Sequence, residues 1–212
     1  PPLPDEALVP PERFRVDQEP ELLPAAGVDL DDDDESADEP TRIDLLVVIE
    51  KEALRELSGL GGWLKQQIRN AIVDLNLALA DSGVNAEFNL QAIKRDRYPV
   101  DGSDYDFAEQ MLYDLTDPDD TLMRKSQRLR RKFGSDMVAV VMRRNEGLCG
   151  LAWIGGRRGQ GIQPGDEGIA FSVTSWRCVA SGTLAHEIGH NMGAQHAHSD
   201  PTGNRSGAYD ES

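Results

Sequence analysis

The chain has 212 residues, a formal net charge of −16 and 39% hydrophobic residues. This length is enough for one modest folded domain, and the acidic balance argues against a nucleic-acid partner. The longest wholly apolar run, residues 45–49, is far too short to cross a bilayer, so we expect no membrane span.

The first 40 residues differ in composition from the rest. They hold 8 of the 12 prolines, and 14 acidic residues against 2 arginines, a net charge of −12. Residues 29–35 repel one another and carry little apolar surface, which predicts disorder. We interpret residues 1–40 as a pro-segment that inhibits the folded part, or more simply as a solvated linker. The acidic run lacks the ligand spacing of a calcium loop, so a Ca²⁺ site is unsupported.

Residues 41–212 carry alternating strand and helix patterns. Strands are predicted at residues 43–49, 87–94 and 136–142, with two more beginning at 149 and 168, and helices at residues 62–80, 106–115 and 121–133. This order predicts an α/β (α+β) fold: a mixed, mostly parallel, twisted sheet with a long packing helix and a further helix beneath it near residue 186.

That last helix carries three histidines and one glutamate at a distinctive spacing. His186 and His190 lie four residues apart, so on a helix both can face one metal ion, with Glu187 beside it. Gly193 can turn the chain so that His196 returns to the same ion. Three histidines would leave zinc an open position for water, and a carboxylate next to that water can take its proton.

A surface helix could carry these residues by accident. From average residue usage, the five fixed positions arise by chance in about one chain of this length in 10⁵. Apolar residues also supply the packing face that such a helix needs: Leu184, Ala185, Ile188 and Met192. We therefore prefer a catalytic zinc site to a purely structural helix.

The pattern HExxHxxGxxH resembles the signature of the metzincin clan of zinc endopeptidases. Residues 150–155 and 168–173 resemble the strand pair before the active-site helix of adamalysin-like (reprolysin-like) members. Residues 43–48, 76–85, 149–153 and 185–193 are similar to bacterial peptidyl-Asp metalloendopeptidases, and the resemblance covers roughly residues 42–200. It implies a secreted zinc endopeptidase acting on peptide or protein substrates, with His186, His190 and His196 as zinc ligands and Glu187 as general base.

The resemblance also implies where a substrate binds. The clan pairs an extended peptide with an upper edge strand, which here corresponds to Gly150, Leu151, Ala152 and Trp153. A plain hairpin is the alternative for this glycine-flanked stretch. Arg157 and Arg158 follow, with Arg177 nearby in sequence, and guanidinium groups bind carboxylates, so a preference for acidic (Asp) residues is an expectation beside simple solvation.

Two departures from the clan pattern bear on the site. No methionine follows Met192 to form the methionine-bearing turn, and Ala197-His198-Ser199-Asp200 follows the third histidine, which makes His198 a lesser candidate ligand. We expect the chain to be a fragment with an incomplete C-terminal subdomain. The alternative is a catalytically impaired zinc-binding module.

The two cysteines, Cys149 and Cys178, flank the predicted strand pair. In an oxidising compartment they would form a disulfide, and the alternative is two buried thiols. The family resemblance favours the disulfide, and with it a secreted, extracellular or periplasmic location. A targeting segment is then expected to precede this numbering.

Overall fold

The computed structural model describes residues 5–8, 39–156 and 165–196. Its centre is a six-stranded sheet with the strand order β1-β5-β6-β4-β2-β3. The strands are β1 (Asp5–Leu8), β2 (Thr41–Glu50), β3 (Ala86–Asp96), β4 (Met137–Met142), β5 (Gly150–Trp153) and β6 (Phe171–Ser175). All neighbouring strands run parallel except β5 and β6, which are antiparallel. The mixed, mostly parallel sheet confirms the predicted fold class.

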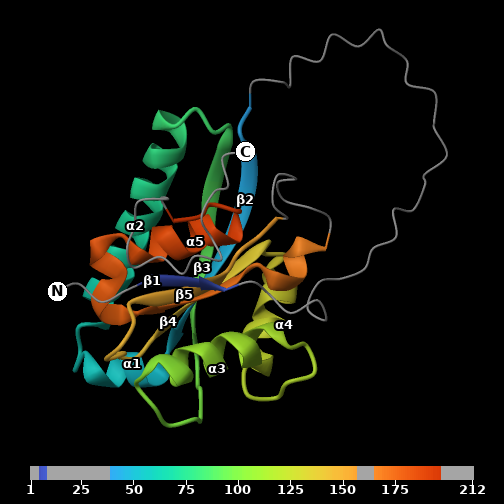
Figure 1. Ribbon diagram of the computed structural model, residues 1–212. Helices are drawn as coiled ribbons and strands as arrows, with labels where there is room; N and C mark the ends of the chain where they lie inside the picture. The colour runs from blue at the N-terminus through green and yellow to red at the C-terminus, as the bar shows by residue number, and fades with distance from the viewer. Residues whose placement is uncertain (1–4, 9–38, 157–164, 197–212) are drawn as a thin grey trace, which may run out of the picture.

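Helices cover both faces of the sheet (Figure 1). On one face lie α1 (Lys51–Glu56), α2 (Gly61–Asp81), the 3-10 helix η4 (Trp176–Ser181) and α5 (Thr183–Asn191). On the other lie α3 (Tyr105–Thr116) and α4 (Arg124–Phe133). A shorter 3-10 helix, η3 (Asp166–Ile169), precedes β6.

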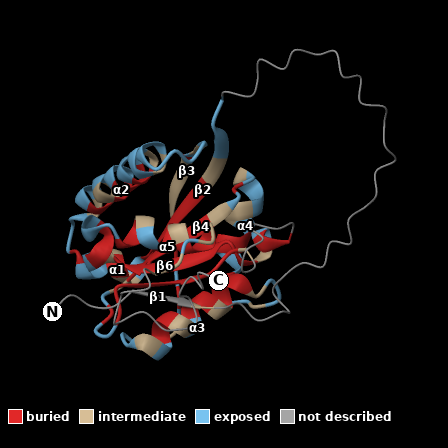
Figure 2. Ribbon diagram, turned by 45° about the horizontal axis from the view of Figure 1, so that its top comes forward, coloured by how far each residue is buried: buried red, intermediate tan, exposed pale blue. Residues whose placement is uncertain are grey.

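The continuous apolar run of β2 serves both layers because successive side chains on a strand point to opposite faces. Leu45, Val47 and Ile49 pack with α2 and α5, whereas Leu46 and Val48 pack with α3. All five are fully buried, and Figure 2 shows the central strands as the buried core between exposed helix faces. A two-sided core of this kind explains why β2 does not alternate between polar and apolar residues.

The helices predicted over residues 62–80 and 106–115 correspond to α2 and α3 within one residue at each end. The helix predicted from residue 121 begins only at Arg124, and the strand expected from residue 168 begins at Phe171 because η3 precedes it. Within the described ranges, no helix is both long enough and apolar enough to cross a membrane.

Strand β1 was not predicted from the sequence; it lies inside the proline-rich first 40 residues. Its four residues pair in parallel with β5, from Asp5 beside Gly150 to Leu8 beside Trp153. A four-residue strand in such a segment shows no periodicity of its own, and its pairing with β5 depends on residues far away in the chain. Residues 1–4 and 9–38 of the predicted pro-segment lie outside the described residues.

Candidate metal centre

Helix α5 holds the histidines because its apolar side chains fix its orientation on the sheet. Leu184 and Ile188 are fully buried in the core shared with α2 and β2. That packing leaves His186 exposed to solvent and places His190, which is 1% exposed, deeper in the same site.

Gly193 brings the third histidine back toward the helix. It adopts the left-handed conformation, with φ 91°, which residues with a Cβ resist. Its N–H donates to the His190 carbonyl at 2.9 Å, and the Ala194 N–H donates to the Gly189 carbonyl at 3.0 Å. The helix therefore ends in a tight turn, as predicted, and His196 folds back beside His186 and His190.

The three imidazoles present the same atom to a common point. The Nε2 atoms of His186 and His190 are 2.9 Å apart, those of His186 and His196 3.0 Å, and those of His190 and His196 3.2 Å. Three ligands at tetrahedral positions around zinc would have nitrogens about 3.3 Å apart, given Zn–N distances near 2.0–2.1 Å. The donor set and its spacing therefore fit a zinc ion, whereas calcium prefers oxygen ligands.

The hydrogen bonding of His190 prepares its Nε2 for a metal. Its Nδ1 lies 2.7 Å from the Ala194 carbonyl oxygen, which can only accept, so Nδ1 carries the proton and Nε2 keeps its lone pair. Burial, with a smaller contribution from the neighbouring histidines and against the opposing hydrogen bond to the Ala194 carbonyl, lowers the pKa of His190 to about 4. His190 is thus neutral at physiological pH, as a metal ligand must be.

Glu187 lies on the same helix with its carboxylate fully buried against β5. A Cβ atom added to Gly150 would lie only 2.5 Å from Oε1 of Glu187. The absent side chain at position 150 is therefore what allows this carboxylate to approach the strand. The first residue of β5 is therefore in contact with the Glu187 carboxylate, the predicted general base.

The end of α5 is held to β5 and β6 by polar contacts. The side-chain amide of Asn191 donates to the carbonyls of Trp153 at 2.9 Å and Phe171 at 3.0 Å. The N–H of Gly155 donates to the His190 carbonyl at 2.9 Å. Sequence reasoning missed Asn191; the one signal available was a polar residue directly after the second histidine, at a helix position that the apolar pattern expects to be buried.

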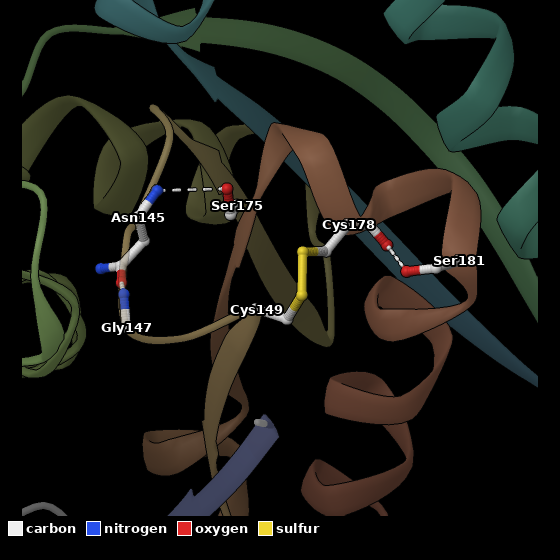
Figure 3. Close-up of a disulfide and its surroundings, with 6 residues drawn as sticks. All are labelled: Asn145, Gly147, Cys149, Ser175, Cys178 and Ser181. Atoms are coloured by element: carbon white, nitrogen blue, oxygen red, sulfur yellow. Dashed lines mark hydrogen bonds between the residues drawn. A yellow bond between two sulfur atoms is a disulfide. The ribbon is translucent and has the colours of Figure 1, made fainter. Parts of the chain in front are cut away.

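The start of the same strand pair is held covalently. Cys149 and Cys178 form a disulfide with their Cα atoms 5.5 Å apart, which confirms the predicted bridge. It joins the residue before β5 to η4 (Figure 3). The Ser175 N–H also donates to the Cys149 carbonyl at 2.7 Å. The segment leading into α5 is therefore fixed to the strand beside the site.

The predicted substrate residues fall into two groups. Gly150, Leu151, Ala152 and Trp153 form β5, next to α5, but β5 is not the edge strand that the sequence predicted, because β1 pairs with its outer side. Arg157 and Arg158, and the lesser ligand candidate His198, lie outside the described residues. Arg177 is exposed and, with Arg144, lines a cavity of ≈ 500 Å³ beside the disulfide.

A mixed sheet with a histidine-bearing helix packed beneath it, three convergent imidazoles and an adjacent buried glutamate define a metallopeptidase of the zincin class. The family model of the reprolysin-like metallopeptidases, family M12B, matches residues 65–197. The chain belongs to this family.

The chain is also similar to individual proteins, in sequence or in fold. The chain is 30% identical over 188 residues to the peptidyl-Asp metalloendopeptidase of Pseudomonas aeruginosa, covering 81% of this chain and 29% of that protein. A solved chaperone–substrate complex shares the fold with a TM-score of 0.56 and 20% identity, over 76% of this chain and 27% of that one. Metalloproteinase-II from Bacteroides fragilis aligns with a TM-score of 0.48 and 22% identity, over 76% and 45% of the two chains. The chain thus spans under a third of the length of the Pseudomonas relative.

Proposed function

We propose that this chain is the catalytic part of a zinc-dependent endopeptidase that hydrolyses peptide bonds in protein substrates. The observation that carries the proposal is the convergence of three Nε2 atoms, all within 3.2 Å of one another, beside the buried carboxylate of Glu187. His186, His190 and His196 would hold the ion. Imidazole nitrogens suit zinc, and the identity of the metal is part of the proposal.

When bound, zinc with three protein ligands supplies a Lewis acid that polarises the substrate carbonyl and makes water a better nucleophile. Glu187 then moves the proton. Its carboxylate accepts one proton as the water oxygen bonds to the carbonyl carbon, and it donates that proton to the amide nitrogen as the C–N bond breaks. Burial against β5 holds the carboxylate in one position for both transfers.

The substrate would lie as an extended strand along the edge of β5. Backbone hydrogen bonds to such an edge give affinity without selecting a sequence, and side-chain pockets give selectivity. Because Gly150 touches Glu187, a peptide on this edge would pass beside the carboxylate and the histidines.

We further propose a preference for acidic residues near the scissile bond. It is supported by the name of the Pseudomonas relative and by Arg177, which lines the cavity beside the disulfide; Arg144 lines the same cavity, where it is paired with Glu146. Arg157 and Arg158 are additional candidates from the sequence. The test compares matched peptides with Asp or Asn at one position: a ratio of kcat/KM near one would reject the preference.

Two further parts of the proposal concern location and regulation. The disulfide between Cys149 and Cys178 supports export to an oxidising compartment, the periplasm or the extracellular space. Inhibition of the site by residues 1–40 remains our proposal for the acidic tail. Fractionation of cells that express the protein would test the first part.

Hydrolysis of reduced, carboxymethylated casein by the zinc-loaded full chain tests the catalytic proposal. Glu187→Gln should keep about one zinc per chain and lose activity by at least roughly 10²-fold, as expected for the loss of a general base. Equal activity of Glu187→Gln and the parent would reject Glu187 as the base. Bound zinc without hydrolysis in the parent would favour the alternative, a zinc-binding module without catalysis.

A further inference from the structure

The edge of β5 that a substrate would use is already covered. β5 has two neighbours: β6 on one side and β1 on the other, so the partner of its outer edge is the four-residue strand Asp5–Leu8. Without β1, β5 would be the terminal strand of the sheet and would present unpaired backbone groups to a peptide. A peptide cannot pair with this edge while β1 occupies it.

β1 also lies at the catalytic end of the strand. Asp5 is the register partner of Gly150, the residue whose missing side chain makes room for Glu187. Paired strands lie about 4.8 Å apart, so the backbone at Asp5 passes one strand spacing from the residue that touches the general base. β1 contacts α5 as well as β5, and Figure 1 shows it alongside β5 with α5 next to both.

Backbone and side-chain contacts hold β1 in place. The Ile154 N–H donates to the Leu8 carbonyl at 2.8 Å. Leu8 is partly buried and packs against the core cluster that contains Leu151 and Trp153. β1 is therefore bound by the same two kinds of interaction that would bind a substrate, strand pairing and an apolar anchor.

We propose that β1 is an inhibitory strand: residues 5–8 occupy the substrate edge of β5 and must leave before an extended peptide can bind. This inference rests on the proposed function, and it replaces a general effect of the acidic tail with a defined element. Inhibition then depends on backbone pairing, and the negative charge of residues 9–38 is not required.

The side of β1 that faces β5 provides a matched pair of variants. Because the Leu8 carbonyl points toward β5, the backbone groups of residue 6 point the same way and those of residue 7 point away. Glu6→Pro removes an N–H that faces β5, whereas Ala7→Pro removes one that faces away, a position that an edge strand tolerates. Glu6→Gln controls for the lost charge.

Binding can be measured without catalysis. In a Glu187→Gln background, we expect Glu6→Pro to bind reduced, carboxymethylated casein roughly three- to tenfold more tightly, the equivalent of one net hydrogen bond. Ala7→Pro and Glu6→Gln should bind like the parent. Equal affinity for all forms, or equal gains for both proline variants, would overturn the inference.

Measurements of activity, and of its dependence on salt concentration, complete the test. With Glu187 intact, Glu6→Pro should raise kcat/KM on casein by the same factor, and a peptide with the sequence of residues 1–10 should inhibit it competitively. Salt does not screen hydrogen bonds between backbones, so the increase in kcat/KM caused by Glu6→Pro should persist from about 0.05 to about 0.5 M NaCl. An increase that vanished at high salt would overturn strand pairing as its cause. If no form hydrolysed casein but Glu6→Pro still bound it more tightly, the catalytic proposal would be overturned, whereas the inference that β1 covers the edge of β5 would hold.

Discussion

The side chain of Glu187 packs directly against the backbone of Gly150, which is possible because position 150 has no Cβ atom. A Cβ atom at position 150 would lie 2.5 Å from Oε1, 2.6 Å from Cγ and 2.7 Å from Cδ of Glu187. The backbones of both partners are held in place, because β5 lies between β1 and β6 and the end of α5 is bonded to both β5 and β6. The position of the general base is therefore determined by the strand as much as by its own helix.

Gly150→Ala should accordingly displace the carboxylate without removing a ligand. We expect the zinc content to stay at about one ion per chain and kcat on casein to fall by about 10²-fold, the cost of a misplacement near 1 Å. Gly62→Ala is the matched control, since a Cβ there meets nothing within 4 Å. Parent-like kcat in Gly150→Ala would show that Glu187 can move without loss.

Removal of the buried ligand should cost most of the metal. His190→Ala leaves two nitrogens, which rarely hold zinc tightly, so zinc measured after dialysis should fall well below one ion per chain. Ser82→Ala, at an exposed position directly after α2, is a suitable control. Full zinc retention in His190→Ala would mean that the ion is held elsewhere.

The side chain of Asn191 should stabilise the fold because it donates hydrogen bonds to two buried carbonyl groups. Asn191→Leu keeps a side chain branched at Cγ and leaves the buried carbonyls of Trp153 and Phe171 without this donor. Each lost partner costs about 1–3 kcal/mol, so the free energy of unfolding should fall by roughly 2–4 kcal/mol, allowing for partial relaxation. Urea unfolding of the zinc-free protein measures it, and a change below about 0.5 kcal/mol, the range of ordinary surface substitutions, would contradict the role.

The disulfide should stabilise the fold by restricting the unfolded chain. Its cysteines are 29 residues apart, and loop-closure entropy for that length gives about 3.5 kcal/mol. A Cys149→Ala and Cys178→Ala double variant should unfold at correspondingly lower urea concentration, and a reductant should destabilise the parent but not the variant. An equal response of both proteins to the reductant would exclude the bridge as its target.

The elements and residues predicted from the sequence were those with a local signal. α2 carries apolar residues at helical spacing, and the histidines of α5 have a spacing that only a shared metal explains well. α1 and η4 are six residues each, too short to show a period, and were not predicted. Their positions follow from the packing of Ala53 and Val179 into the core.

Roles that depend on contacts between distant segments could not be predicted in the same way. Gly150 was expected to be part of the strand that binds substrate, and the group that approaches it in the structure is the carboxylate of Glu187, 37 positions later in the numbering. β1 pairs with a strand more than 140 positions away. Neither relationship leaves a pattern in the residues near either partner.

The antiparallel pair β5–β6 is tied at both of its ends. The disulfide fixes the start of β5 to the segment that follows β6, and the Asn191 side chain bonds to the last residue of β5 and the first of β6. Fraying of the two strands from either end is therefore opposed, and they should open only together with α5, as one cooperative unit. Hydrogen exchange at the amides of Leu151, Val173 and Ile188 would then give the same free energy of opening. A peptide that arrives at β5 would meet an edge whose shape is set before binding, and little of its binding energy would be spent on ordering the protein.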